Sequence, residues 1–244
     1  MPFPIWQFCY LCPHHKQFIL KARTVILTIA AIIIADQCLK FYIKLNYFAG
    51  EEHKVLGNWF KLHFVENEGM AWGWKFGGGF GKIALTLFRL IAVIWGSFLL
   101  KDFIKKKYHK GFIICASLIY AGALGNLLDS MFYGLIFDTS YDPVFHTNYL
   151  TVAKMVPFGK GYTTFLHGKV VDMLYFPIID SYYPKWFPFI GGDKFDFFAP
   201  VFNVADASIS VGVIVLLLFQ NKFFKKEEHK TEPITTATID TAID

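Results

Sequence analysis

The sequence predicts an all-α membrane protein: a bundle of four transmembrane helices with a small sheet and inserted loops on its outer face. Of the 244 residues, 55% are hydrophobic and only 18% are charged, whereas soluble domains carry about 25% charged residues. The mean hydropathy is +0.40. The apolar residues are concentrated in long runs, which excludes the disordered, collagen-like and disulfide-scaffold classes.

Four runs have the roughly 17 to 25 apolar residues that a helix needs to cross a bilayer. They cover about 24–47, 82–100, 111–133 and 202–219. Many of their residues are β-branched, but this does not argue against helices, because the backbone in lipid must form its hydrogen bonds internally.

Three clusters of basic residues flank these runs and indicate how the chain is oriented. All three must lie on one side of the membrane, and the positive-inside rule makes that side cytoplasmic. We therefore expect cytoplasmic termini, with the long loops 48–81 and 134–201 outside. The net charge of +5 is then a topology signal and not a nucleic-acid-binding surface. The clusters are Lys16, Lys21 and Arg23; Lys101, Lys105, Lys106, Lys107 and Lys110; and Lys222, Lys225 and Lys226.

The two ends of the chain, 1–22 and 223–244, are expected to be a cytoplasmic segment and a disordered cytoplasmic tail around a membrane domain, 23–222. No small-residue cleavage site follows the first run, so it is expected to act as an uncleaved signal-anchor. Cys9 and Cys12 precede two histidines, but a structural zinc site needs two well-spaced ligand pairs in a folded module. We therefore expect no metal and no cofactor.

The first outer loop has the pattern of a strand. Phe60, Leu62 and Phe64 alternate with polar residues, and glycines follow them, which predicts a short sheet on the outer membrane surface. The later stretch 137–200 is rich in aromatic residues, which suit the headgroup layer.

An ionisable side chain at bilayer depth is costly, so each one requires a reason; five stand out here, with two asparagines as neutral companions. With the expected topology, all of them fall in the outer half of the membrane, which points to one polar site open to the outer face. They are Asp36, Lys40, Arg89, Asn126, Asp129, Asn203 and Asp206.

The spacing of these residues sharpens the site. Asp36 and Lys40 are four residues apart, so they share a helix face and can pair. Asn126 with Asp129, and Asn203 with Asp206, each show a spacing of three. Asp172 lies in the apolar run 170–176, which is unusual for a solvated loop charge.

Carboxylates are the chemistry that the sequence offers. There is no G-x-S-x-G elbow, H-E-x-x-H zinc motif, P-loop or dinucleotide fingerprint. Two aspartates held close together cannot both ionise, so one keeps its proton. The charged one can take a proton from water while the other polarises a peptide carbonyl. Hydrolysis of a peptide bond near the outer leaflet is then chemically feasible without a metal.

Two other classes have to be weighed against a peptidase. A small transporter or proton channel would also bury acids, but its polar residues would extend through the whole depth of the membrane. A non-catalytic membrane scaffold would not need aspartates on separate elements.

Five blocks, in order along the chain, resemble those of the lipoprotein signal peptidases (signal peptidase II), a family of bacterial intramembrane aspartic proteases. The resemblance covers roughly 22–136 and 168–222. The blocks are Asp36-Gln37-x-x-Lys40; Asn67-x-Gly69-x-Ala71-Trp72; 122–129, from Gly122 to Asn126 and Asp129; Val170-Val171-Asp172; and Phe202-Asn203-x-Ala205-Asp206.

The resemblance implies that Asp172 and Asp206 are the catalytic dyad of a peptidase in the bacterial inner membrane. Such enzymes remove the signal peptide of diacylglyceryl-modified prolipoproteins, just before the lipidated cysteine. It also implies a small extracytoplasmic β-cradle, an amphipathic helix and inhibition by globomycin, and we expect a monomer that binds no nucleic acid. The residues that would shape and support the site are Asp36, Lys40, Asn67, Gly122, Asn126, Asp129, Asn203 and Ala205.

Three features depart from the family pattern. Ser130 stands where the family usually has an arginine, and Arg89 could replace it. Met173 stands where an aromatic residue is usual. The loop 137–168 is longer than the family core requires, and it suits either a lid or a partner surface.

Structural alternatives remain open for the supporting residues. Asp36 and Lys40 could be a purely structural pair, and Asp129 suits an orienting role better than a catalytic one. Asn126 and Asn203 could be hydrogen-bonding contacts between helices, and Gly122 could simply allow close packing.

Overall fold

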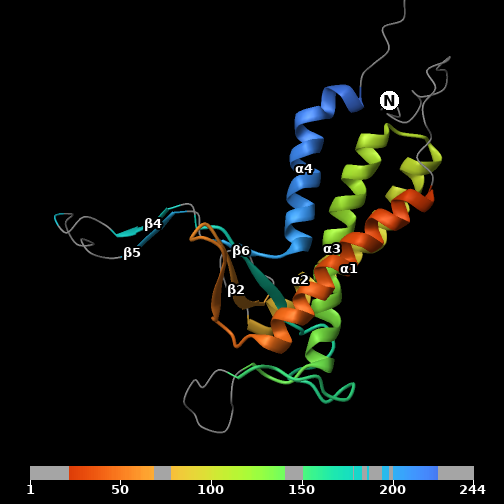
Figure 1. Cartoon of the computed structure of the whole chain (residues 1–244). Helices are drawn as coiled ribbons and strands as arrows, with labels where there is room; N and C mark the ends of the chain where they lie inside the picture. The colour runs from red at the N-terminus through yellow and green to blue at the C-terminus, as the bar shows by residue number, and fades with distance from the viewer. Residues whose placement is uncertain are drawn as a thin grey trace, which may run out of the picture.

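The computed structural model describes residues 22–68, 78–140, 151–177, 179–182, 186, 194–197 and 200–224. The predictions for 1–21, for Gly69, Ala71 and Trp72, and for 225–244 lie outside these residues. Within the described part of the chain there are four helices, each long and apolar enough to cross a membrane. The predicted bundle of four membrane helices is therefore confirmed (Figure 1). The helices are α1 (Ala22–Asn46), α2 (Gly78–Lys105), α3 (Lys110–Ile136) and α4 (Val204–Phe223).

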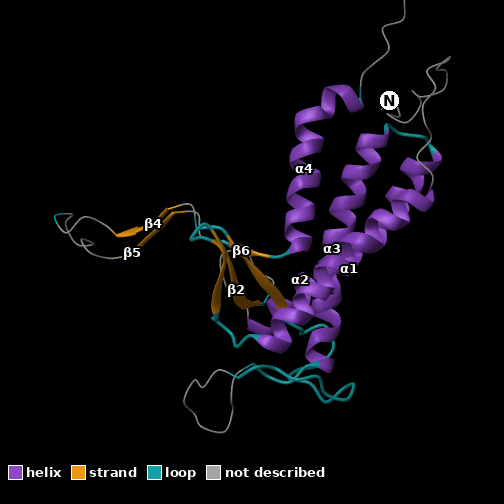
Figure 2. Ribbon diagram, viewed as in Figure 1, coloured by secondary structure: helices purple, strands orange, loops and turns teal. Residues whose placement is uncertain are grey.

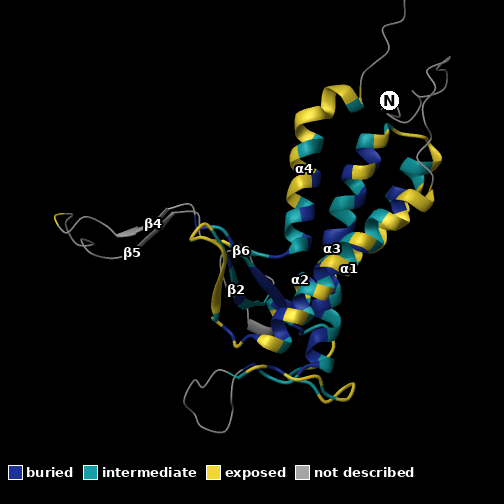
Figure 3. Cartoon of the chain, in the orientation of Figure 1, coloured by how far each residue is buried: buried dark blue, intermediate teal, exposed yellow. Residues whose placement is uncertain are grey.

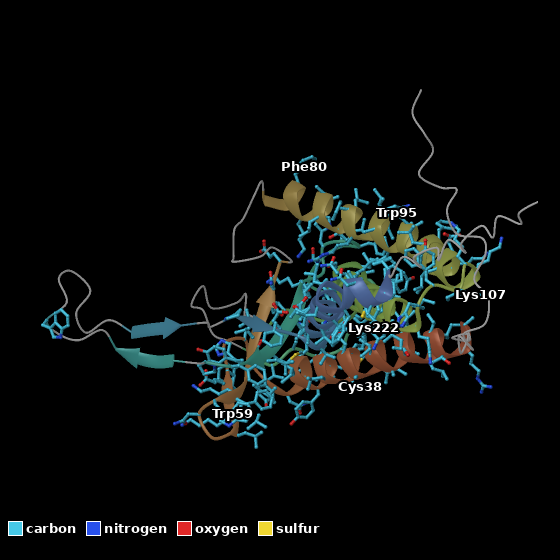
Figure 4. All side chains as sticks on the ribbon, turned by 90° about the horizontal axis from the view of Figure 1, so that it is seen from above. Cys38, Trp59, Phe80, Trp95, Lys107 and Lys222 are labelled. Carbon is cyan, nitrogen blue, oxygen red and sulfur yellow. The ribbon has the colours of Figure 1, made fainter. Side chains whose placement is uncertain are left out.

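Helix α3 is the centre of the bundle, because it contacts each of the other three helices. The outward faces of the others carry exposed apolar side chains, as a lipid-facing surface requires (Figure 3). Phe80 and Trp95 of α2 are 80% and 64% exposed, and both point away from the bundle (Figure 4). The outward faces of the bundle are therefore apolar, and Val25, Leu100, Phe112 and Ile113 form an apolar cluster inside it.

All four helices differ from their expected limits, and the differences are largest for α2 and α4. Helix α2 covers Gly78–Lys105 and not 82–100; beyond the C-terminal end of the apolar run, Asp102 pairs with Lys106 at 2.8 Å. Helix α4 begins at Val204 and not at 202, because Phe202 belongs to a strand. Asn203 is the N-cap between them, and its side chain accepts a hydrogen bond from the backbone N–H of Asp206 at 2.8 Å.

A small antiparallel sheet lies at one end of the bundle (Figures 1 and 2). Its strand order is β1-β2-β3-β6. The start of α1, the α2–α3 connection and the end of α4 lie at the other end (Figure 1). A separate hairpin of two strands, β4 and β5, projects sideways from the sheet (Figure 2). The strands are β1 (Glu52–Leu56), β2 (Phe60–Asn67), β3 (Val170–Tyr175), β4 (Ile179–Tyr182), β5 (Lys194–Phe197) and β6 (Val201–Phe202).

An apolar core joins the sheet to the bundle. Ile43 of α1, Phe64 of β2 and Tyr133 of α3 meet Val171 and Met173 of β3 in one buried cluster. Met173, where the sequence departs from the family pattern, is fully buried there. The strand that carries Asp172 is thus fixed by apolar contacts on both sides of that residue.

Of the inserted loop, residues 137–140 and 151–168 are described, and the second part is docked against the C-terminal end of α3. The last carbonyls of a helix have no partner within the helix. Here the carbonyls of Gly134, Leu135 and Ile136 accept hydrogen bonds from backbone N–H groups at 163, 159 and 156, at 2.9 to 3.0 Å. The loop therefore caps α3; a role as a lid or a partner surface stays a prediction.

Candidate active site

The residues singled out in the sequence converge from five elements on one region between the bundle and the sheet. Residues predicted from separate blocks of the chain thus become neighbours through direct hydrogen bonds. Helix α1 brings Asp36 and Lys40, α3 brings Gly122, Asn126 and Asp129, β2 brings Asn67, β3 brings Asp172, and the start of α4 brings Asn203, Ala205 and Asp206.

Asp172 lies in the middle of β3 and is 3% exposed. A bulge in β2 places it opposite Val65, so that Asn67, two residues further along β2, is its diagonal neighbour on the same face. Asn67 Nδ2 donates to Asp172 Oδ2 at 3.0 Å, and Asn203 Nδ2 donates to Asp172 Oδ1 at 2.7 Å. Burial, together with the negative charge of Asp206, raises the pKa of Asp172 to about 7.

Asp206 lies in the first turn of α4 and is held by two asparagines. Its side chain and that of Asn203 form a capping box around the helix start. Asn126 Nδ2 of α3 donates to Asp206 Oδ1 at 2.7 Å. A helix N-terminus and a hydrogen-bond donor both stabilise a negative charge.

Asn126 and Asn203 connect the two aspartates. Asn203 Nδ2, which binds Asp172, also donates to Asn126 Oδ1 at 3.1 Å. Asn126 in turn binds Asp206 through its Nδ2 and accepts from Lys40 Nζ through its Oδ1 at 3.0 Å. The two amides therefore fix both carboxylates in one hydrogen-bonded network.

Lys40 is fully buried between two carboxylates. Its Nζ lies 2.7 Å from Asp36 Oδ2 and 2.6 Å from Asp129 Oδ2. Asp36 Oδ1 accepts from the backbone N–H of Ala205 at 2.8 Å, which ties α1 to the start of α4. Asp36 and Lys40 are thus a pair, as the spacing predicted, and Asp129 is a third member on α3.

Gly122 and Ala205 mark where α3 and α4 touch. A Cβ atom at Gly122 would lie 2.2 Å from the Ala205 carbonyl oxygen, which is shorter than any real contact. Ala205 itself is fully buried. The close packing that the sequence left open as a role for Gly122 is present, and it holds the start of α4 against Asn126.

Arg89 contacts Ser130, the residue that replaces the usual arginine of the family. Its Nη1 lies 3.4 Å from Ser130 Oγ on α3, and the arginine is half-buried. The Ser130 hydroxyl itself donates to the Asn126 carbonyl at 3.0 Å. A guanidinium from α2 therefore lies next to the residue that follows Asp129.

Several polar residues of this region were missed in the sequence. Gln37, inside the first block, donates from Nε2 to Asp129 Oδ1 at 2.9 Å and accepts from Tyr133 OH at 3.0 Å. Lys44 is buried and pairs with Glu66 of β2. The spacing of four from Lys40 was a signal for Lys44, because it continues the Asp36–Lys40 face by one helical turn.

The chemistry of the site follows from these contacts. Two carboxylates on separate elements share a network of amides, one of them with a raised pKa, so the pair can hold one proton and one negative charge. Within the described residues, no group of three or more His, Cys, Asp or Glu side chains could hold a metal ion. The two carboxylates suit general acid–base chemistry.

Comparison with known proteins gives consistent matches over most of the chain. The family model for signal peptidase (SPase) II matches residues 28–222. A lipoprotein signal peptidase of Porphyromonas gingivalis is 43% identical over 199 residues, which are 81% of this chain and 83% of that protein. One from Amoebophilus asiaticus is 32% identical over 203 residues, covering 82% of this chain and 78% of its own.

A solved structure shares the fold. It is that of a bacterial membrane enzyme determined by the in meso method at 2.3 Å, with a TM-score of 0.54 and 24% sequence identity. The match covers 88% of this chain and 98% of that one. The arrangement of helices and sheet is therefore one that a membrane enzyme uses.

Proposed function

Since the chain belongs to the signal peptidase II family of aspartic peptidases, we propose that Asp172 and Asp206 are the catalytic dyad with which it cleaves lipoprotein precursors. The observation that carries this proposal is the bridge of Asn203 and Asn126 between the two carboxylates, at 2.7 Å from each. Of the four aspartates in the region, Asp36 and Asp129 pair directly with Lys40. That leaves Asp172 and Asp206 for the reaction.

The dyad works with one proton, which rests mainly on Asp172 because the pKa of this carboxyl is raised to about 7. Asp206 takes a proton from water as the water oxygen attacks the scissile carbonyl carbon, and Asp172 gives its proton to the carbonyl oxygen. The resulting diol collapses as the C–N bond breaks. The leaving nitrogen takes the proton from Asp206, and Asp172 regains a proton from a diol hydroxyl, so the dyad returns to its initial state.

The proposed orientation puts the sheet and the site outside and both termini inside. Arg23 lies at the start of α1, Lys107 in the α2–α3 connection and Lys222 at the end of α4. These three segments lie at the end of the bundle remote from the sheet (Figure 1). Positive charge marks the cytoplasmic side. The site then faces the outer leaflet of the bacterial inner membrane.

The proposed substrate is a diacylglyceryl-modified prolipoprotein, cut just before its lipidated cysteine. Its acyl chains would anchor that cysteine in the outer leaflet, at the level of an outer-half site. We further propose that the enzyme works as a monomer and that globomycin-type peptides occupy the same site.

The test is cleavage of a diacylglyceryl-modified precursor peptide by the purified full-length chain in detergent, followed by mass spectrometry. We expect Asp172→Asn and Asp206→Asn each to lower kcat at least about 100-fold, the usual scale of general acid–base catalysis. Asp102→Asn is the matched control, because Asp102 lies on the surface of α2 and pairs only with Lys106 among the ion pairs of the described residues. Near-normal turnover in either dyad variant would exclude the proposed dyad.

A further inference from the structure

Helix α2 carries a charge into the site that the mechanism above does not use. Arg89 lies within the membrane-spanning part of α2, is half-buried and has its Nη1 3.4 Å from Ser130 Oγ. A guanidinium at this depth is costly unless negative groups face it. The carboxylates whose negative charges act on this guanidinium are Asp206, Asp129 and Asp172.

The charge balance of the site explains why a second cation is needed. Lys40 is shared between Asp36 and Asp129, at 2.7 and 2.6 Å. When both carboxylates are ionised, this trio keeps one excess negative charge. A dyad with one proton adds another negative charge close by. A second bound proton would relieve this repulsion, but it would also remove the base that activates water.

We propose that Arg89 is a positioning residue of the reaction: its guanidinium compensates the charge beside Asp206 and keeps the dyad ionised at working pH. This inference rests on the proposed dyad. Arg89 acts through the negative charge of Asp206, whereas the charge of Lys40 on α1 is shared by Asp36 and Asp129 and also acts on Asp172.

The position of Ser130 makes the proposal specific to this chain. Ser130 directly follows Asp129 on α3, is 2% exposed and is the side chain that the guanidinium contacts. The side chain of an arginine at 130 would begin where the Arg89 guanidinium now contacts Ser130. In an enzyme that lacks Arg89, the new guanidinium can therefore occupy the space that the Arg89 guanidinium leaves. The charge can thus be moved from α2 to α3 without leaving the site.

The other charged groups near the dyad must stay unchanged when residues 89 and 130 are substituted. Helix α1 contributes Asp36 and Lys40, α3 contributes Asp129, and α2 also carries Lys82, whose charge interacts with Arg89. Strand β2 presents the neutral Asn67, and its neighbour Glu66 is paired with Lys44 and Lys169. A change at 89 or 130 leaves all of them in place.

The experiment measures kcat/KM against pH for the full-length chain and four variants, with the precursor peptide described above. We expect Arg89→Met to lower kcat/KM about tenfold or more at neutral pH and to move the acidic limb upward by about one pH unit, as loss of a nearby positive charge requires. Arg89→Lys should keep the limb in place. The double variant Arg89→Met with Ser130→Arg should move the limb back and recover most of the rate. Lys101→Met, at an exposed lysine of the same helix, should change neither.

The outcomes separate the possible failures. An Arg89→Met enzyme with an unmoved acidic limb, or a relocated arginine that leaves the limb displaced, overturns the proposal and reduces Arg89 to a packing residue. Asp172→Asn and Asp206→Asn are measured in parallel. If they stay active, the dyad itself is wrong; if they are inactive while Arg89→Met behaves like the parent, only the role of Arg89 is wrong.

Discussion

Two lysines one helical turn apart on α1 show how the same side chain serves two purposes. Lys40 and Lys44 are both fully buried. Lys40 belongs to a network with Asp36, Asn126 and Asp129, the Lys40 network, which joins α1 to α3 and to the dyad. Lys44 belongs to a network with Glu66, Ser140 and Lys169, the Lys44 network, which joins α1 to β2 and to the outer loop.

The two networks have opposite charge ratios. In the Lys40 network one cation serves two carboxylates, whereas in the Lys44 network two cations serve one, because Lys169 Nζ also lies 3.1 Å from Glu66 Oε2. Aromatic rings complete the second network: Lys44 Nζ lies 5.6 Å from the Phe137 ring and 5.2 Å from the Tyr162 ring. The Lys40 network therefore depends on its one lysine, whereas the Lys44 network keeps a second cation, Lys169, when Lys44 is lost.

The largest predicted effect is the difference between Lys40→Met and Lys44→Met. Loss of Lys40 leaves Asp36 and Asp129 buried without a cation, which should cost about 3–5 kcal/mol and abolish cleavage. Loss of Lys44 leaves Glu66 with Lys169 and with the Ser140 hydroxyl at 2.8 Å, so we expect about 1–2 kcal/mol and nearly full activity. Thermal unfolding in detergent and the cleavage assay measure both.

A second substitution separates charge from packing at Lys40. Adding Asp129→Asn to Lys40→Met removes one of the two uncompensated carboxylates, so it should recover part of the lost stability. If Lys44→Met proved as damaging as Lys40→Met, the contrast between the two networks would be wrong.

The sequence predicted the Lys40 network and the dyad region because polar residues within apolar runs are conspicuous. Asp36, Lys40, Asn126, Asp129 and Asn203 were found by their depth in the membrane, and the spacing of three connected Asn203 with Asp206. Each of these residues lies on a long helix or at its start, where counting along the chain gives the position in space.

The Lys44 network was not predicted, because its members come from elements whose placement is not local. Glu66 lies on a strand whose register depends on a bulge between Leu62 and Val65. Ser140 and Lys169 flank a loop that caps α3 through backbone groups, which leave no side-chain pattern in the sequence. A link between Arg89 and position 130 could be predicted only because Ser130 stands where the family usually has an arginine.

The second prediction uses pH to compare one carboxylate next to each network. Burial raises the pKa of Asp172 to about 7, so its contribution to stability is present in acid and is lost as pH rises through about 7. Burial opposes ionisation of Glu66 too, but Lys44 and Lys169 outweigh it and lower the pKa. Its contribution is therefore present above the ordinary glutamate value and is lost as pH falls through the lowered value.

Asp172→Asn and Glu66→Gln should change the pH dependence of the free energy of unfolding in different pH ranges. In the parent, the free energy of unfolding should fall between about pH 4 and 7 by up to about 1.4 kcal/mol per pH unit because of Asp172. Asp172→Asn should remove this fall, and the variant should unfold at a higher temperature than the parent at pH 8. Glu66→Gln should flatten only the loss in acid. Unfolding midpoints measured from pH 3 to 9 test this, and parallel curves for the parent and Asp172→Asn would contradict the raised pKa.

The smallest predicted effect tests whether the Lys44 network is purely structural. Tyr162 OH accepts a hydrogen bond from the backbone N–H of Lys169 at 2.6 Å, while its ring faces Lys44 and Lys169. Tyr162→Phe keeps the ring and removes the acceptor, so it should cost about 1 kcal/mol of stability and leave kcat unchanged. A clear fall in kcat without unfolding would mean that the outer loop communicates with the dyad through Lys169 and Glu66, since Glu66 directly precedes the Asn67 that binds Asp172. In that case the Lys44 network would belong to the active site. Lys40 and Lys44 would then both support catalysis and would differ only in the size of their effects.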